Sequence, residues 1–148
     1  MPPLSEADAR AFLAGRHQGV LATIKRSDGR PQLSNVAYAV IGGRVRVSVT
    51  AGRAKTGNLR ADPRVSLYVT SDDFWTYVVA EGVAELSPVA RTPGDRTCRR
   101  LLETYEAASG QQHPDPDEFF AAMVADERLE IAFGIDHVYP VTSEAATR

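Results

Sequence analysis

The sequence has one cysteine, no long apolar run and almost no excess of charge. Cys98 is the only cysteine among 148 residues, which excludes an internal disulfide framework and is typical of a reducing compartment. No apolar run approaches the roughly 18–20 residues that cross a bilayer. The net charge is −2, so we expect no bulk attraction to nucleic acid or anionic lipid. The acidic N-terminal stretch lacks the basic region of a signal peptide, and we therefore expect a cytoplasmic protein.

The familiar catalytic signatures are absent as well. The sequence contains no GxSxG, HExxH or P-loop motif and no GxGxxG after a strand. His17, His113 and His137 are widely scattered, so no metal site is expected. Cys98 lies among apolar residues at helical spacing, which favours a buried structural cysteine over a nucleophile. No catalytic residue is predicted.

What the sequence does contain is strand-like alternation. In RVRVSVT, Val45, Val47 and Val49 point to one side while the arginines and hydroxyl residues point to the other. Turn residues separate further β-rich runs, and short helices are expected over 5–14, after Arg53, over 95–108 and around 119–124. The predicted strands are GVLATIK, QLSNVAYAVI, RVRVSVT, VSLYVT, WTYVVAEGVAEL with Gly82 as a bend, and RLEIAFGIDHVYPV. Six strands in consecutive hairpins favour one domain, residues 1–148, built as a small antiparallel barrel.

A local cluster of cations stands out against the neutral total. The segment AGRAKTGNLRADP carries Arg53, Lys55 and Arg60 at a junction between a strand and a helix. The free N–H groups at a helix N-terminus favour an anion, and arginine and lysine add charge-assisted hydrogen bonds. The alternative interpretation is a solvated helix with ordinary surface cations. Composition alone leaves both open.

Three stretches resemble a known family: GVLATIKRSDGRPQLSNVAY, then RVRVSVT with RAKTGNLRADPRVSL, then WTYVVAEGVAEL. They are similar to the split β-barrel flavin and deazaflavin proteins related to pyridoxamine 5′-phosphate oxidase. Within that family they resemble the branch that uses coenzyme F420, a deazaflavin found mainly in actinobacteria and methanogens. The alanine- and arginine-rich composition agrees with an actinobacterial source.

The resemblance implies a fold, an assembly and a site. The fold is mainly β, a six-stranded antiparallel split β-barrel with peripheral short helices. The assembly is a homodimer with cofactor sites along the interface. The segment RAKTxN would receive the cofactor's phosphate, central strands would flank its ring, and the strand from Trp75 would complete the site from the same or the other subunit. The cofactor-binding residues expected on this basis are Ser34, Asn35, Val36, Val49, Thr50, Arg53, Ala54, Lys55, Thr56, Asn58, Leu59, Trp75, Thr76, Tyr77, Val78 and Val79.

The function so implied is an F420-dependent oxidoreductase that transfers a hydride between F420 and a conjugated small molecule. Asn35, in an otherwise apolar strand, is expected to be buried against the ring edge, a backbone group or a water. Tyr77 and His137 are the two candidate proton donors. The alternatives are an FMN-dependent oxidase or reductase, because FMN also ends in a phosphate, and a non-catalytic module that binds F420. Oxidation of pyridoxamine 5′-phosphate itself is not expected, because the chain has no second phosphate cluster.

Overall fold

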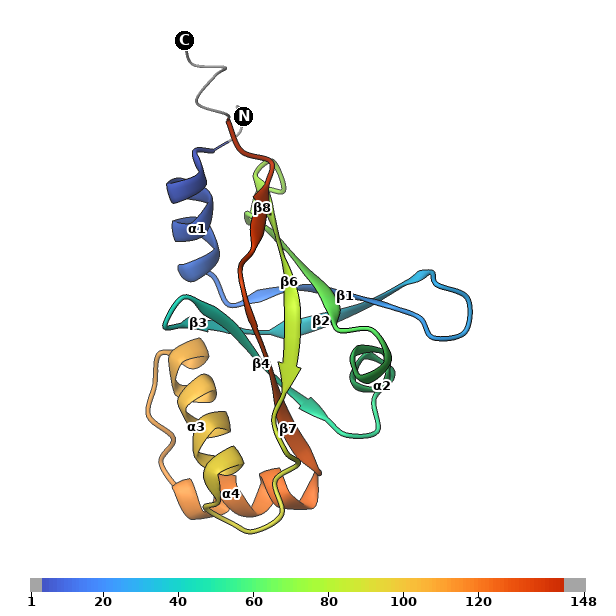
Figure 1. Ribbon diagram of the computed structural model, residues 1–148. Coiled ribbons are helices and arrows are strands. Elements are labelled where there is room, and N and C mark those ends of the chain that lie inside the picture. The colour runs from blue at the N-terminus through green and yellow to red at the C-terminus, as the bar shows by residue number, and fades with distance from the viewer. Residues whose placement is uncertain (1–3, 143–148) are drawn as a thin grey trace.

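The computed structural model describes residues 4–142 as a curled β-sheet with four short helices (Figure 1). The strands are β1 (Gln18–Ile24), β2 (Pro31–Ala37), β3 (Ala39–Ile41), β4 (Arg44–Thr50), β5 (Arg64–Thr70), β6 (Tyr77–Leu86), β7 (Arg128–Gly134) and β8 (His137–Tyr139). The helices are α1 (Glu6–Ala14), α2 (Ala54–Ala61), α3 (Arg96–Ser109) and α4 (Pro116–Ala125). No helix among these residues is long and apolar enough to span a membrane.

The sheet is antiparallel and closes on itself only in part. Its strand order is β2-β1-β5-β6-β7-β4-β3, with β8 added beside β6, and β2 also approaches β4. The inward faces of the strands form one core in which Val45, Val47 and Val49 are at most 1% exposed. Burying each such side chain stabilises the fold by about 1.5–3 kcal/mol. The predicted mainly β split barrel is confirmed.

The strand count differs from the predicted six because two of the expected strands are interrupted. Tyr38 separates β2 from β3: its side chain is fully buried and its hydroxyl donates a hydrogen bond to the Leu13 carbonyl at 2.6 Å. The last expected strand is divided into β7 and β8 between Gly134 and His137. β6 accommodates this break, because it pairs with β8 over residues 79–81 and with β7 over residues 84–86.

Gly82 lies where β6 changes neighbours. A Cβ atom at this position would meet the Gly134 carbonyl oxygen at 2.2 Å, which no side chain tolerates. The expected bend at Gly82 is therefore a close approach of two backbones, and the barrel requires glycine there.

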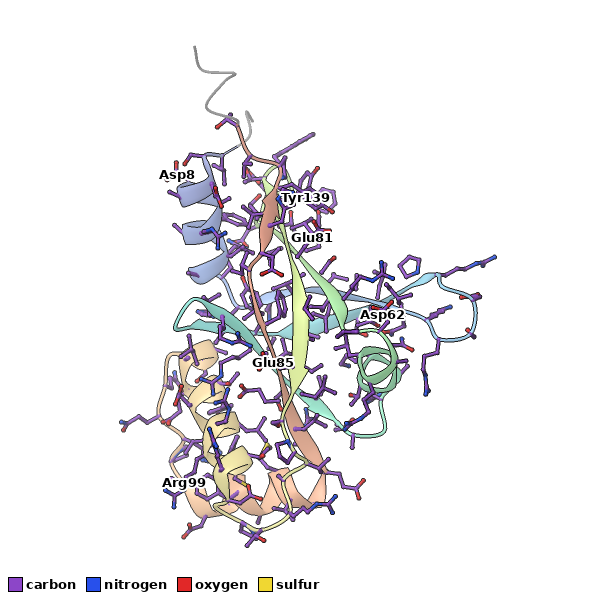
Figure 2. The ribbon with its side chains drawn as sticks, in the orientation of Figure 1. Asp8, Asp62, Glu81, Glu85, Arg99 and Tyr139 are labelled. Carbon is purple, nitrogen blue, oxygen red and sulfur yellow. The ribbon has the colours of Figure 1, made fainter. Side chains whose placement is uncertain are left out.

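The helices begin where the sequence provides capping residues. The Ser5 side chain accepts a hydrogen bond from the Asp8 backbone N–H, as expected, and Asp95 does the same for Cys98 at the start of α3. Helices α3 and α4 pack together against β4 and β7 at one end of the molecule (Figure 1). Arg99 on α3 and Tyr139 on β8 mark opposite ends (Figure 2).

Candidate functional site

The strongest candidate site is the junction between β4 and α2. Helix α2 begins at Ala54 with Arg53 as its N-cap residue, and the Arg53 side chain makes no capping hydrogen bond. The backbone N–H groups of Thr56 and Gly57 donate to the Arg53 carbonyl, whereas those of Ala54 and Lys55 have no acceptor among residues 4–142. We call Arg53, Ala54 and Lys55 the cationic cradle, because two positive side chains and two free N–H groups lie together there.

Two of the expected phosphate ligands have side chains turned into the fold instead. Thr56 is fully buried, and its hydroxyl donates a hydrogen bond to the Thr50 carbonyl at 2.8 Å. Asn58 is buried, and its amide donates to the Thr23 hydroxyl at 3.1 Å. These bonds fix α2 to β4 and to β1. In the single chain both residues therefore position the cradle and do not form part of its surface.

Arg128 is a third cation, next to the cradle, and the sequence analysis did not find it. It is the first residue of β7 and pairs with Thr50 across the β4–β7 ladder. Its Nε is buried with no hydrogen-bond partner among the described residues, its Nη1 lies 3.5 Å from the Ser48 hydroxyl, and Asp126 is 3.9 Å away. No local pattern links residues 53 and 128; only the strand pairing brings them together.

The electrostatics of the cradle favour an anionic ligand. Partial burial, and then the neighbouring charges of Arg53 and Arg128, lower the pKa of the Lys55 ammonium below its ordinary value. Neither Arg53 nor Lys55 makes an ion pair within residues 4–142. An anion bound here would compensate for the burial and for the repulsion between the cations.

Other expected cofactor residues have their side chains in or near the core. Val49, Leu59 and Val78 are at most 1% exposed, and Val79 is 7% exposed. The alternation along β4 explains the burial of Val49, since it turns this side chain inward and leaves Thr50 on the outer face. In the single chain these four side chains therefore pack in the barrel, and their expected contact with a cofactor stays a prediction.

The β2 residues lie at the edge of the sheet. Asn35 is exposed in the single chain, so its expected burial is wrong there. Asn35 and Val36 line an open pocket of about 570 Å³ that also contains the ion pair between Arg16 and Asp72. The Ser34 hydroxyl accepts a hydrogen bond from the Gln32 amide at 3.0 Å.

The residues expected to complete the site lie in the first part of β6 and in the turn that precedes it. Trp75 and Thr76 precede β6 in the turn after β5, so the expected strand start at Trp75 is corrected to Tyr77. Trp75 is 76% exposed. Tyr77 is stacked on Tyr68, with ring centroids 5.5 Å apart. In one chain, none of these side chains joins the cradle.

The histidines and the cysteine are dispersed over residues 4–142 and form no common cluster there. Cys98 is fully buried, and burial raises the pKa of its thiol, as expected for a structural cysteine. No group of three or more His, Cys, Asp or Glu side chains in this range has the arrangement of a metal site. His17, His113 and His137 lie on separate parts of the fold.

Comparisons with known proteins agree with this architecture. A family model described as pyridoxamine 5′-phosphate oxidase matches residues 5–131, and members of that family are generally oxidoreductases that bind flavin-type cofactors. Among solved structures, a conserved hypothetical protein from Mycobacterium tuberculosis is 28% identical, with a TM-score of 0.71 and coverage of 95% of this chain and 91% of that one.

Two further structures carry names that refer to a cofactor. A protein named F420 reductase is 25% identical over 94% of this chain and 98% of its own, with a TM-score of 0.65. A FAD-binding protein from Mesorhizobium loti is 24% identical over 93% and 92%, also with a TM-score of 0.65, and shows the fold alone. Since the family model covers most of the sequence, and the split barrel agrees with it, the chain belongs to the pyridoxamine 5′-phosphate oxidase family.

Proposed function

We propose that this protein is an F420-dependent oxidoreductase that transfers a hydride between coenzyme F420 and a conjugated small molecule. The observation that carries the proposal is the cationic cradle: Arg53 and Lys55 have no acidic partner among the described residues, beside two free N–H groups. The similarity to a protein named F420 reductase supports the choice of cofactor.

The cradle fits a phosphate group. The N-terminus of α2 favours an anion by about 0.3–1 kcal/mol. Hydrogen bonds from the two cationic side chains add about 1.5–3 kcal/mol each. Arg53 can bind two phosphate oxygens at once, while Lys55 acts as a point charge. Thr56 and Asn58 hold the helix so that these groups face one ligand.

The ring of the cofactor would lie beside Thr50, where β4 ends. When bound, a reduced deazaflavin supplies the hydride from a ring carbon, so the chain has to orient its substrate and exclude water. Ser34, Asn35 and Val36, together with the segment from Trp75 to Tyr77, are assigned to the ring surface across a dimer. Exposed Asn35 would then find its polar partners in the assembly, since its side chain makes no hydrogen bond within residues 4–142. The proton donor is left unassigned.

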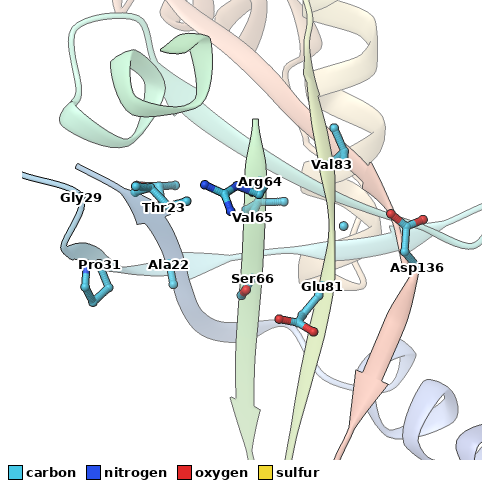
Figure 3. A pocket seen from close by; sticks show the side chains of 12 residues that line it. Ala22, Thr23, Gly29, Pro31, Arg64, Val65, Ser66, Glu81, Val83 and Asp136 are labelled. Atoms are coloured by element: carbon cyan, nitrogen blue, oxygen red, sulfur yellow. The ribbon is translucent and has the colours of Figure 1, made fainter. Parts of the chain in front are cut away.

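We propose a homodimer because the outer face of the sheet exposes several large apolar side chains among its polar ones. Four large side chains there are 41–63% exposed: Leu33, Tyr77, Val83 and Tyr139. Figure 3 shows part of this face, where Ser66, Glu81 and Val83 line a pocket of about 460 Å³. Exposed apolar patches of this kind mark interaction surfaces, and proteins of this family are often dimers.

Sedimentation equilibrium should show a dimer at micromolar concentration. Val83→Lys should shift the protein toward monomer, because a charge would be buried at the contact. The exposed control Glu85→Lys lies two residues further along β6 and should have less effect. A monomeric wild-type protein would contradict the proposed assembly and, with it, a site shared between subunits.

The proposed enzyme acts as one domain in the cytoplasm. Its single cysteine is buried as a free thiol, which suits a reducing compartment. Fractionation of the source cells is the direct test, and recovery of the protein outside the cytoplasm would contradict this location.

The experiment that tests the function is a cofactor titration followed by turnover. Purified protein is titrated with F420 and with FMN, and reduced F420 is then mixed with quinones, enones and tetrapyrroles. We expect F420 to bind more tightly than FMN and its reduced form to be consumed with at least one acceptor. Retention of yellow FMN on purification would favour the flavin alternative. Tight F420 binding with no consumption by any acceptor would favour a binding module.

A further inference from the structure

A second pocket lies beside the cradle, between the sheet and helices α3 and α4. Its volume is about 400 Å³, which is within the range of small-molecule sites. The helices supply an apolar wall that includes Tyr105, Phe119 and Met123. The sheet supplies a polar wall that includes Ser48 and Arg128. One side of the pocket is therefore apolar and the other carries a positive charge.

The apolar wall is built from packed aromatic rings. The ring centroids of Tyr105 and Phe119 are 5.5 Å apart, and the His113 ring lies 5.4 Å from each of them. Phe119 is mostly buried, while Tyr105 is 42% exposed at the surface of α3. Rings held in this way offer a flat apolar ligand an extended surface at little cost in side-chain entropy.

The positive charge on the polar wall belongs to Arg128, which has no close acidic partner among the described residues. The nearby carboxylate of Glu130 is already engaged by Arg46 at 2.8 Å, by Arg100 at 2.9 Å and by the Thr104 hydroxyl at 3.1 Å. Arg128 has only Asp126 at 3.9 Å, in an ion pair whose carboxylate side chain is 55% exposed. Exposed pairs of this kind contribute little, so Arg128 remains available to an anion.

We propose that this pocket binds the substrate, and that the substrate is a flat, mainly apolar molecule with one acidic group, which Arg128 binds. The assignment of this ligand as hydride acceptor rests on the proposed function, whereas its binding does not. Ser48 and Thr50 share one face of β4, and Arg128 lies opposite Thr50, so the pocket adjoins the place assigned to the ring. A neutral molecule of the same shape would leave the charge of Arg128 unpaired and would gain nothing from it.

The test compares two fluorescent probes that share one ring system. 1-Anilinonaphthalene-8-sulfonate carries an acidic group, and N-phenyl-1-naphthylamine lacks it. Arg128→Gln should weaken binding of the sulfonate roughly tenfold or more, the expected loss of a charged hydrogen bond, and change binding of the amine less than twofold. Arg60→Gln, which removes an exposed cation from the far end of α2, is the matched control and should change neither.

A second variant locates the probes. Met123→Trp fills the pocket from α4 and should reduce the binding of both probes at least tenfold, with urea unfolding confirming that the variant is folded. Sulfonate binding that is insensitive to Arg128→Gln, or probe binding that survives Met123→Trp, would overturn the proposal.

F420 titration of the wild-type protein separates this proposal from the proposed function. If the probes behave as expected but F420 does not bind, the proposed ligand binding in the pocket is supported and its role in hydride transfer is contradicted. If F420 binds and is turned over but Arg128→Gln does not change sulfonate binding, the pocket proposal is contradicted and the proposed function is retained.

Discussion

Two groups of cations lie near the paired strands β4 and β7, one on the strands and one where α2 follows β4, and they differ in what surrounds them. On the β4–β7 ladder, Arg46 is 5% exposed and its guanidinium is held by Glu130 and Glu103, with nitrogen–oxygen distances of 2.8 and 2.5 Å. Burial opposes its charge, but these hydrogen bonds and carboxylate charges outweigh it and raise the pKa of Arg46. Beyond the end of β4, where α2 begins, the cations of the cradle and the neighbouring Arg128 have no comparable partner among the described residues.

The difference separates a structural charge from a charge that is free to bind a ligand. The Arg46 group is complete, because every charge in it has an opposite charge within hydrogen-bond distance, and it fixes α3 on the barrel. The cradle is incomplete: burial and like charges lower the pKa of Lys55 in the isolated chain. Variants of the first group should therefore affect stability, and variants of the second should affect binding.

The largest expected effect on stability is at Glu130. Glu130→Gln leaves Arg46 buried without its main carboxylate, and we expect the free energy of unfolding to fall by about 3–5 kcal/mol, measured by urea denaturation. Glu85→Gln removes an exposed ion pair with Arg44 from the same sheet and should cost less than about 1 kcal/mol. Equal losses in the two variants would contradict the comparison.

At Lys55 the expected effects on stability and on binding have opposite signs. Lys55→Met removes a partly buried, repelled charge, so the ligand-free protein should be slightly more stable at neutral pH, by less than about 1 kcal/mol because water screens the charge, while its affinity for F420 falls. Because the folded-state pKa of Lys55 lies below its ordinary 10.5, the unfolded chain retains the proton to higher pH. The advantage of the variant should therefore be full at neutral pH and shrink as the pH rises toward 10.5. Urea unfolding at several pH values measures this, and a variant less stable than wild type at neutral pH would contradict it.

The smallest effect concerns the cap of α3, the helix that covers the Arg46 group. Burial alone would raise the pKa of Asp95, but backbone N–H groups of Arg91, Cys98 and Thr92 outweigh it and lower the pKa to about 2. Asp95→Ala should cost about 1 kcal/mol at neutral pH. The contribution of Asp95 is complete above pH 3.8 and is lost as the pH falls through about 2, so wild type and variant should converge below that pH. The control Asp136→Ala, at an exposed residue outside the helices, should show neither effect, and a difference that persists well below pH 2 would contradict this account of the cap.

Local pattern was enough to predict the parts of the fold that depend on neighbours in sequence. The valine alternation of β4, the capping of α1 by Ser5 and the start of α2 after Arg53 all follow from residues within a few positions of each other. The cations of the cradle were found for the same reason. Such features need no knowledge of which strands pair.

What the sequence could not provide are the contacts that cross the chain. Arg46 alternates with buried valines, a pattern typical of a surface cation, yet it is buried and paired with Glu130. Glu130 lies more than 80 residues away in the sequence, so no local pattern could predict this pairing. The same pairing of β4 with β7 brings Arg128 next to the cradle. For Asn35 the error was the reverse: its apolar neighbours in sequence predicted burial, but its strand lies at the sheet edge and leaves it exposed.

The most direct test of the account is an F420 titration of the double variant Arg53→Ala with Lys55→Ala beside the wild-type protein. Each lost charged hydrogen bond removes about 1.5–3 kcal/mol, so affinity should fall by about a hundredfold or more while the unfolding transition stays cooperative. An unchanged dissociation constant in the folded double variant would show that the junction of β4 and α2 is an ordinary charged surface.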